Sequence, residues 1–170
     1  MDTLLIAVGP DESKRTDLLV DEADDLADEH TTIVLGHVFR SENYGYSDET
    51  ASLLAKMGYN VSVNPPHPNE LAGRKTTIRD IEAELEDRGY DVEVRGAIGG
   101  REEQLLELID DVDADHLIVG GRKRNPMGKA VFGSLAQKLL MNAPCPVTLV
   151  REEGDMKKTL ANALNPTRSH

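Results

Sequence analysis

The chain has 170 residues, and its 31 acidic side chains outnumber 19 basic ones, giving a formal charge of -12. This charge argues against a nucleic-acid-binding protein, which needs a basic surface to neutralise phosphates, and against binding to an anionic membrane. The length suits one domain, and only 4% of the residues are aromatic, so we expect an aliphatic core. This excess of acidic residues also resembles the composition of proteins adapted to high salt. It is a hint about the environment of the protein and gives no information about its activity.

The chain starts with Met1 and enters an apolar run at once, without a basic leader or a long apolar segment. This predicts neither a signal peptide nor a membrane-spanning helix. The one cysteine, Cys145, cannot form an internal disulfide, and its place before an apolar run predicts a small buried residue. A reducing cytoplasm fits these features.

Short apolar runs alternate with longer amphipathic stretches along the chain. The predicted elements are strand and helix in strict alternation, beginning with a strand: Thr3–Val8, Glu12–His30, Thr31–Val38, Glu70–Arg88, Tyr90–Arg95, Arg101–Val112, Asp115–Gly120, Ser134–Asn142 and Pro146–Arg151. Strands separated by helices pair in parallel through right-handed crossovers, which predicts an α/β protein with an open, doubly wound, five-stranded sheet.

Two stretches fall outside this alternation. Phe39–Asn69 is long, rich in Asn, Pro and Gly, and too irregular for an assignment. We expect one domain over residues 1–153 and a polar C-terminal tail over 154–170, frayed or only briefly helical.

The segment Gly120–Ser134 gathers four basic residues and four glycines in a strongly acidic chain, between a strand and a helix. Glycines let the backbone approach a ligand closely, and Gly133-Ser134 adds backbone N–H groups, a hydroxyl and a helix dipole at one point. Phosphate binding is one interpretation. The other is a surface loop with compensating charge, in which Gly133-Ser134 only caps the helix.

The standard phosphate fingerprints do not decide between the two. A Walker A loop needs Ser or Thr after Gly-Lys, and Gly128-Lys129 is followed by Ala130. The glycine pattern for dinucleotides belongs after the first strand, where the chain has only Gly9–Ser13.

The spacing from Gly120 to Gly133-Ser134 resembles the nucleotide loop of universal stress proteins, in which Gly is followed by two residues, Gly, nine residues, Gly and Ser or Thr. Lys123 stands where the family has its second Gly, and Gly9 stands where nucleotide-binding members carry Asp. His37-Val38 and the helix, Pro-Cys-Pro turn and strand over 134–150 also look like the family. The resemblance covers residues 3 to 151.

The resemblance implies an adenine nucleotide α-hydrolase-like fold with strand order 3-2-1-4-5. It implies ATP or another adenine nucleotide, with Mg²⁺ as a companion, at the point where the strand order reverses. By carry-over, Ala7 and Val8 line the base pocket and Val38 offers backbone groups to the adenine. Gly9, at the position of the family's Asp, would lie near the adenosine. The remaining candidates surround the phosphates: Gly120, Arg122, Lys123, Arg124, Gly133 and Ser134.

No paired carboxylates and no Ser/His/Asp set are placed by a motif, so we predict no catalytic residues and at most slow ATP hydrolysis. No carboxylate cluster predicts a metal site either. His37 is expected to be a packed or capping histidine, and His116 to have a satisfied role in the core.

The resemblance implies a homodimer that pairs through the last strand, Val147–Val150, at the sheet edge. The alternative is that the tail covers this edge. The functional hypotheses are a nucleotide-binding regulatory or stress-response protein, a dimeric interaction module of the same fold that binds no nucleotide, and, last, an α-hydrolase-type enzyme.

Overall fold

A computed structural model describes residues 1–9, 16–41, 53, 56–58, 67–120, 133–150 and 157–160. The strands of this part of the chain are β1 Thr3–Ala7, β2 Thr32–Phe39, β3 Asp91–Ile98, β4 His116–Gly120, β5 Val147–Val150 and β6 Lys157–Leu160. The helices are α1 Thr16–Leu26, α3 Pro68–Gly73, α4 Thr76–Asp87, α5 Arg101–Val112 and α6 Ser134–Asn142. None of these helices combines the length and the apolar composition that a membrane crossing requires.

The strands form one sheet in the order β3-β2-β1-β4-β5-β6. The first five strands pair in parallel, which confirms the predicted order 3-2-1-4-5 and the doubly wound architecture. The sixth strand was not expected. It pairs antiparallel with β5 from Val147↔Leu160 to Val150↔Lys157.

This sixth strand corrects two expectations. The tail was predicted to be frayed or briefly helical, but Lys157–Leu160 is extended and bonded to the sheet. The strand Val147–Val150 was predicted to be an edge strand, but β6 covers it. An unpaired, apolar strand edge is a template for pairing with another extended segment, and here Lys157–Leu160 of the tail pairs with it.

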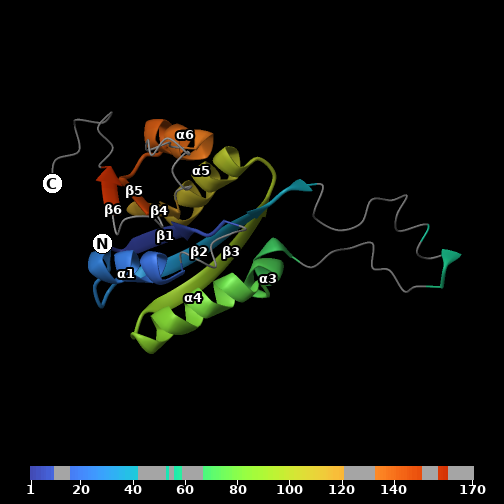
Figure 1. Cartoon of the computed structure of the whole chain (residues 1–170), viewed down its shortest axis with the longest axis horizontal. Coiled ribbons are helices and arrows are strands. Elements are labelled where there is room, and N and C mark those ends of the chain that lie inside the picture. The colour runs from blue at the N-terminus through green and yellow to red at the C-terminus, as the bar shows by residue number, and fades with distance from the viewer. Residues whose placement is uncertain are drawn as a thin grey trace, which may run out of the picture.

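Helices cover both faces of the sheet, with α1 and α4 on one side and α5 and α6 on the other (Figure 1). The central strands β1 and β4 are buried along nearly their whole length, as parallel strands covered on both faces should be. Each face has its own cluster of buried aliphatic side chains, which confirms the expected aliphatic core.

Two predicted helices differ in extent. The first was expected to reach His30 but ends at Leu26. There the Asp28 carboxylate accepts a hydrogen bond from the His30 backbone N–H at 2.8 Å, and the Thr31 hydroxyl accepts one from the Asp28 N–H at 3.0 Å. These local bonds compete with the helix and turn the chain toward β2.

The stretch Glu70–Arg88 was predicted as one helix but forms α3 and α4 with a break between them. Pro68 opens α3, and the His67 ring accepts a hydrogen bond from the Asn69 N–H at 3.1 Å as its cap. Helical periodicity did not reveal this break, because the predicted apolar stripe of Ile78, Ile81 and Leu85 lies entirely within α4.

The start of α3 rests directly on β3. The Gly96 N–H donates to the Asn69 side-chain oxygen at 2.7 Å, and a Cβ at position 96 would lie 2.1 Å from the Pro68 carbonyl oxygen. Only glycine permits this approach of two backbones.

A buried polar pair joins β4 to β5. The His116 Nε2 and the Thr148 hydroxyl lie 2.6 Å apart, and their residues are 7% and 0% exposed. The prediction of a core role for His116 is therefore confirmed.

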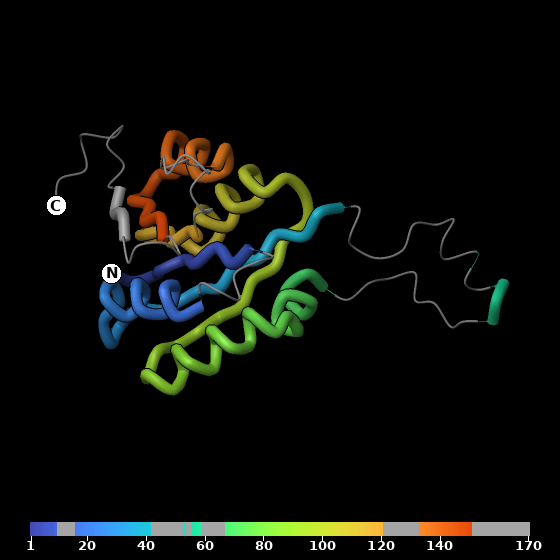
Figure 2. The backbone as a smooth tube through the Cα atoms, in the orientation of Figure 1, coloured from blue at the N-terminus to red at the C-terminus, as the bar shows by residue number. Residues whose placement is uncertain are grey.

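The free side of β3 forms the other edge of the sheet, as the backbone trace in Figure 2 shows. Alternate residues of β3, Asp91, Glu93 and Arg95, are exposed, and Arg95 forms an ion pair with Glu93 at 3.4 Å. Charged side chains of this kind discourage pairing with another strand.

Candidate functional site

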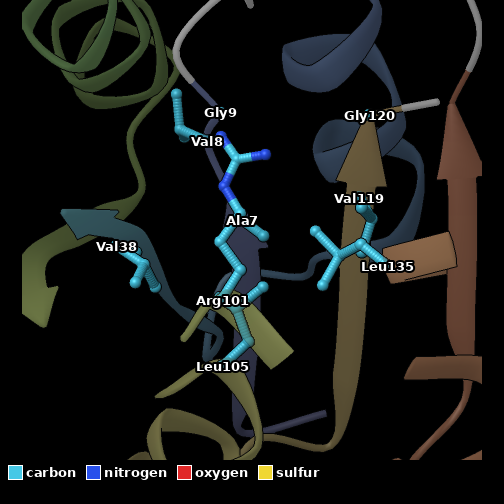
Figure 3. A pocket seen from close by; sticks show the side chains of 10 residues that line it. Ala7, Val8, Gly9, Val38, Arg101, Leu105, Val119, Gly120 and Leu135 are labelled. Carbon is cyan, nitrogen blue, oxygen red and sulfur yellow. The ribbon is translucent and has the colours of Figure 1, made fainter. Parts of the chain in front are cut away.

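A cavity opens where β1 lies between β2 and β4, at the carboxyl ends of these strands. The strand order reverses at this point, and open α/β sheets bind their ligands there. The cavity encloses about 400 Å³ of empty space, including its open mouth. Its lining residues are Ala7, Val8, Gly9, Gly36, Val38, Arg101, Leu105, Val119, Gly120 and Leu135 (Figure 3).

Half of the predicted site residues line this cavity: Ala7, Val8, Gly9, Val38 and Gly120. Ala7, Val8 and Gly9 come from the end of β1, Val38 from β2 and Gly120 from the end of β4. The three segments are far apart in the sequence, and the parallel sheet brings their carboxyl ends together.

Gly133 and Ser134 lie at the start of α6, directly before Leu135 of the cavity wall. Gly133 is the N-cap with extended backbone, φ -60 and ψ 157, and Ser134 is exposed. The first N–H groups of a helix have no partner within it, so this end carries a partial positive charge. Neither Gly133 nor Ser134 is among the residues that line the cavity. Arg122, Lys123 and Arg124 lie outside the described residues.

The sequence did not indicate the other half of the lining: Gly36, Arg101, Leu105, Val119 and Leu135. Leu105 belongs to the buried stripe of α5 and gave no sign of facing a ligand rather than the sheet. Gly36 lies in β2. A Cβ there would come 3.3 Å from the Leu5 and Leu108 side chains, so a side chain at this position would be crowded and would take up space in the cavity. A glycine inside a predicted strand was the one available signal.

His37 holds the end of β1 in place. It is 4% exposed, and its Nδ1 lies 2.7 Å from the Val8 carbonyl oxygen, so Nδ1–H donates to that oxygen. Its ring packs edge-on against Phe39 with centroids 4.6 Å apart. The expected packed role of His37 is confirmed, and its hydrogen bond positions the backbone of a cavity residue.

The two buried histidines predict a loss of stability in mild acid. Burial lowers the pKa of both His37 and His116, and for His37 the nearby charges of Lys75 and Arg101 lower it further, against the opposing effect of the Val8 hydrogen bond. The unfolded chain binds these protons near pH ~6.5, and the folded chain binds them only at lower pH. The free energy of unfolding should therefore be constant above this pH and fall as pH decreases below it.

The expected fall is at most about 1.4 kcal/mol per pH unit for each histidine. Urea unfolding at pH 7.5, 6.5 and 5.5 measures this fall in the free energy of unfolding. These pH values lie above the range in which carboxylates titrate. Replacing His30 by Gln is the control, because the His30 side chain is 82% exposed and its loss should leave the pH dependence intact. A free energy of unfolding that stays level down to pH 5.5 would contradict the prediction.

Within the described residues, no three His, Cys, Asp or Glu side chains gather closely enough to hold a metal ion. Cys145 is fully buried, as expected. The described lining of the cavity supplies apolar side chains, backbone groups and one guanidinium, a combination suited to binding a ligand.

Comparison with known proteins gives consistent results. The model of the "Universal stress protein family" matches residues 1–151. A universal stress protein of Mycolicibacterium smegmatis is 38% identical over 96 residues, which is 56% of this chain and 74% of the relative. Universal stress protein MJ0577 of Methanocaldococcus jannaschii is 25% identical over 126 residues, 71% of this chain and 77% of the relative.

Solved structures share the fold. The structure of MJ0577 superimposes with a TM-score of 0.61 at 18% identity, covering 89% of this chain and 97% of that one. A universal stress protein in complex with cAMP superimposes with a TM-score of 0.52 at 22% identity, covering 88% and 96%.

Proposed function

Because the chain belongs to the universal stress protein family, we propose that it binds an adenine nucleotide in the cavity at the carboxyl ends of β1, β2 and β4. The nucleotide, ATP, ADP or AMP, would control its activity as a regulatory or stress-response protein. The observation that carries this proposal is the position of the cavity at the reversal of strand order, lined by residues of three strands and next to the start of α6.

The lining suggests how the ligand lies. Ala7, Val8 and Val38 form an apolar surface for the adenine, and the backbone around Val38 offers hydrogen bonds to its edge. The phosphates would then meet the N–H groups of Gly120 and of the helix start, together with the Ser134 hydroxyl. In this proposal Arg122, Lys123 and Arg124 would add positive charge, and Mg²⁺ would accompany the phosphates and offset their charge.

A structure of the same fold supports the ligand class, because the universal stress protein that superimposes with a TM-score of 0.52 was solved with cAMP. Turnover is not part of the main proposal. The described cavity lining contains no carboxylate or histidine side chain to activate water, so hydrolysis of ATP would be slow at most.

The experiment is to denature the purified full-length protein and identify any released nucleotide by chromatography, and then to melt the protein with and without ATP and Mg²⁺. A nucleotide at a hundred times its Kd stabilises a protein by about 2.7 kcal/mol, which raises the Tm of a chain this size by roughly 5 to 10 °C. No released nucleotide and an unchanged Tm with millimolar ATP, ADP and AMP would contradict the proposal and favour the interaction module that binds no nucleotide.

Pairing of two copies through Val147–Val150 is a separate part of the proposal, together with a cytoplasmic location. β6 occupies this edge, so a second copy must displace it before the two β5 strands can pair. We expect a chain that ends at residue 153 to dimerise more tightly than the full chain, because nothing then competes for the strand edge. Sedimentation velocity over a range of concentrations measures this. A shortened chain that stays monomeric at every concentration would contradict dimerisation through β5.

A further inference from the structure

His37 bonds to a backbone group of β1 from the face of the sheet opposite the cavity. Side chains along a strand alternate between the two faces. Leu35 belongs to the buried cluster on the side of α1 and α4, and Val38 belongs to the cluster on the side of α5 and the cavity, so His37 shares the face of Leu35. The His37 ring packs against Phe39, whose ring centroid lies 5.7 Å from the Nζ of Lys75, the residue before α4.

The hydrogen-bond ladder between β1 and β2 ends where His37 bonds. Within the described residues, the last backbone bond between these strands runs from the Val8 N–H to the Gly36 carbonyl at 2.8 Å. The next bond of a parallel ladder would run from the Val38 N–H to the Val8 carbonyl. The Val8 carbonyl oxygen instead accepts a hydrogen bond from the His37 Nδ1–H at 2.7 Å.

The backbone of Val38 faces the cavity as a result. In a parallel sheet, the N–H and the carbonyl of one residue point to the same neighbouring strand, and successive residues alternate. The Gly36 carbonyl bonds to Val8, and the Phe39 carbonyl accepts a bond from the Gly99 N–H on the side of β3 at 3.0 Å. Val38 therefore points in the same direction as Gly36, toward the end of β1 and the cavity that Val38 lines (Figure 3).

We propose that His37 ends the pairing of β1 with β2 at the cavity and so leaves the N–H and the carbonyl of Val38 available to a bound ligand. His37 is a positioning residue in this account, because it acts through Val8 from the opposite face of the sheet. Its effect on affinity rests on the proposed nucleotide function.

Removal of the ring would change the partner of the Val8 carbonyl. Val8 is 3% exposed, and a buried acceptor without a hydrogen bond is costly. The Val8 carbonyl would therefore turn to the Val38 N–H and extend the ladder by one bond. The ligand would then lose a hydrogen-bond donor.

The first test is hydrogen exchange of backbone amides in the free wild-type protein, followed by NMR. The Leu35 amide lies within the ladder that joins β2 to β3. We expect the Val38 amide to exchange at least about tenfold faster than the Leu35 amide, because it has no ladder bond to break. A Val38 amide as protected as that of Leu35 would overturn the inference, since the ladder would then continue past Val8.

The second test is isothermal titration calorimetry of AMP with the full-length wild-type protein, His37→Leu and His37→Asn. We expect His37→Leu to bind AMP about tenfold more weakly, as for the loss of one hydrogen bond to the ligand. His37→Asn should recover most of this affinity. The asparagine side-chain nitrogen lies as many bonds from Cβ as the Nδ1 of histidine, so it can donate to the same carbonyl.

His116→Leu is the matched control. His116 is also buried in the described core, but it lies at the amino end of β4, and its Nε2 is 2.6 Å from the Thr148 hydroxyl. This substitution also removes a buried hydrogen bond, so it should destabilise the protein. At a temperature at which all variants are folded, its AMP affinity should equal that of wild type.

The outcomes separate this inference from the proposed function. An unchanged AMP affinity in His37→Leu, or an equal loss in His116→Leu, would overturn the role of His37 and leave the nucleotide site standing. A failure of His37→Asn to recover affinity would also overturn it, because the ring would then matter for its shape and not for its donor. A wild-type protein that binds no AMP, ADP or ATP would overturn the proposed function, and the exchange of the Val38 amide would still decide where the ladder ends.

Discussion

Replacing Gly96 by alanine should destabilise the protein by about 2 to 3 kcal/mol or more, among the largest effects of any single methyl group in this chain. The new Cβ would lie 2.1 Å from the Pro68 carbonyl oxygen and 2.4 Å from its carbonyl carbon. Both are backbone atoms, so no side chain can rotate away, and α3 would have to lift from β3. That movement would also break the bond from the Gly96 N–H to Asn69. Urea unfolding followed by circular dichroism measures the loss.

Gly73→Ala is the matched control. Gly73 is the last residue of α3, no atom lies within 4 Å of a Cβ placed there, and its φ is not positive. Alanine favours the helix by up to about 1 kcal/mol, so this variant should be neutral or slightly more stable. If Gly96→Ala unfolds at the same urea concentration as Gly73→Ala, then α3 does not rest on β3 as described.

Replacing Ser134 by Glu should abolish the rise in Tm with ATP, ADP or AMP while the protein stays folded. A carboxylate at the first position of a helix is favourable, because it lies near the positive end of the dipole. The same carboxylate would occupy and repel the position proposed for the phosphates. The rise of roughly 5 to 10 °C expected for wild type should therefore vanish, as differential scanning fluorimetry would show.

Thr76→Glu makes the same change of charge at the first position of α4, which lies on the other face of the sheet. This control should keep the full rise in Tm. A rise in Tm that persists in Ser134→Glu would contradict the proposed position of the phosphates at the start of α6. A rise that disappears in both variants would point to the overall charge of the protein instead.

Much of the fold could be predicted from the sequence because its patterns are local. The apolar runs became β1 to β5, and the helices Arg101–Val112 and Ser134–Asn142 have the predicted bounds. The helix boundaries were missed because of local capping bonds, and the strand extents because of interactions between distant segments. β3 runs on to Ile98 because it pairs with β2 as far as Phe39, and β6 exists because β5 has an open edge. Neither partner can be identified from the periodicity of the strand itself.

The candidate site divides in the same way. The strand ends were predictable, since parallel strands present their carboxyl ends on one side and the strand order selects the central pair. The position of Arg101 in the cavity lining could not be predicted. The first residue of an amphipathic helix can point to solvent or to the sheet, and the packing of α5 decides which. Gly36 was visible only as a glycine in a strand.

The two edges of the sheet limit how far this protein can assemble by adding strand to strand. On one side β6 pairs with β5, or a second copy displaces β6 and pairs with β5 instead. In either case the edge of β5 is paired. On the other side the charges of Asp91, Glu93 and Arg95 oppose the addition of another sheet. Growth through strands should therefore stop at two molecules, and the chain should resist forming filaments even at high concentration.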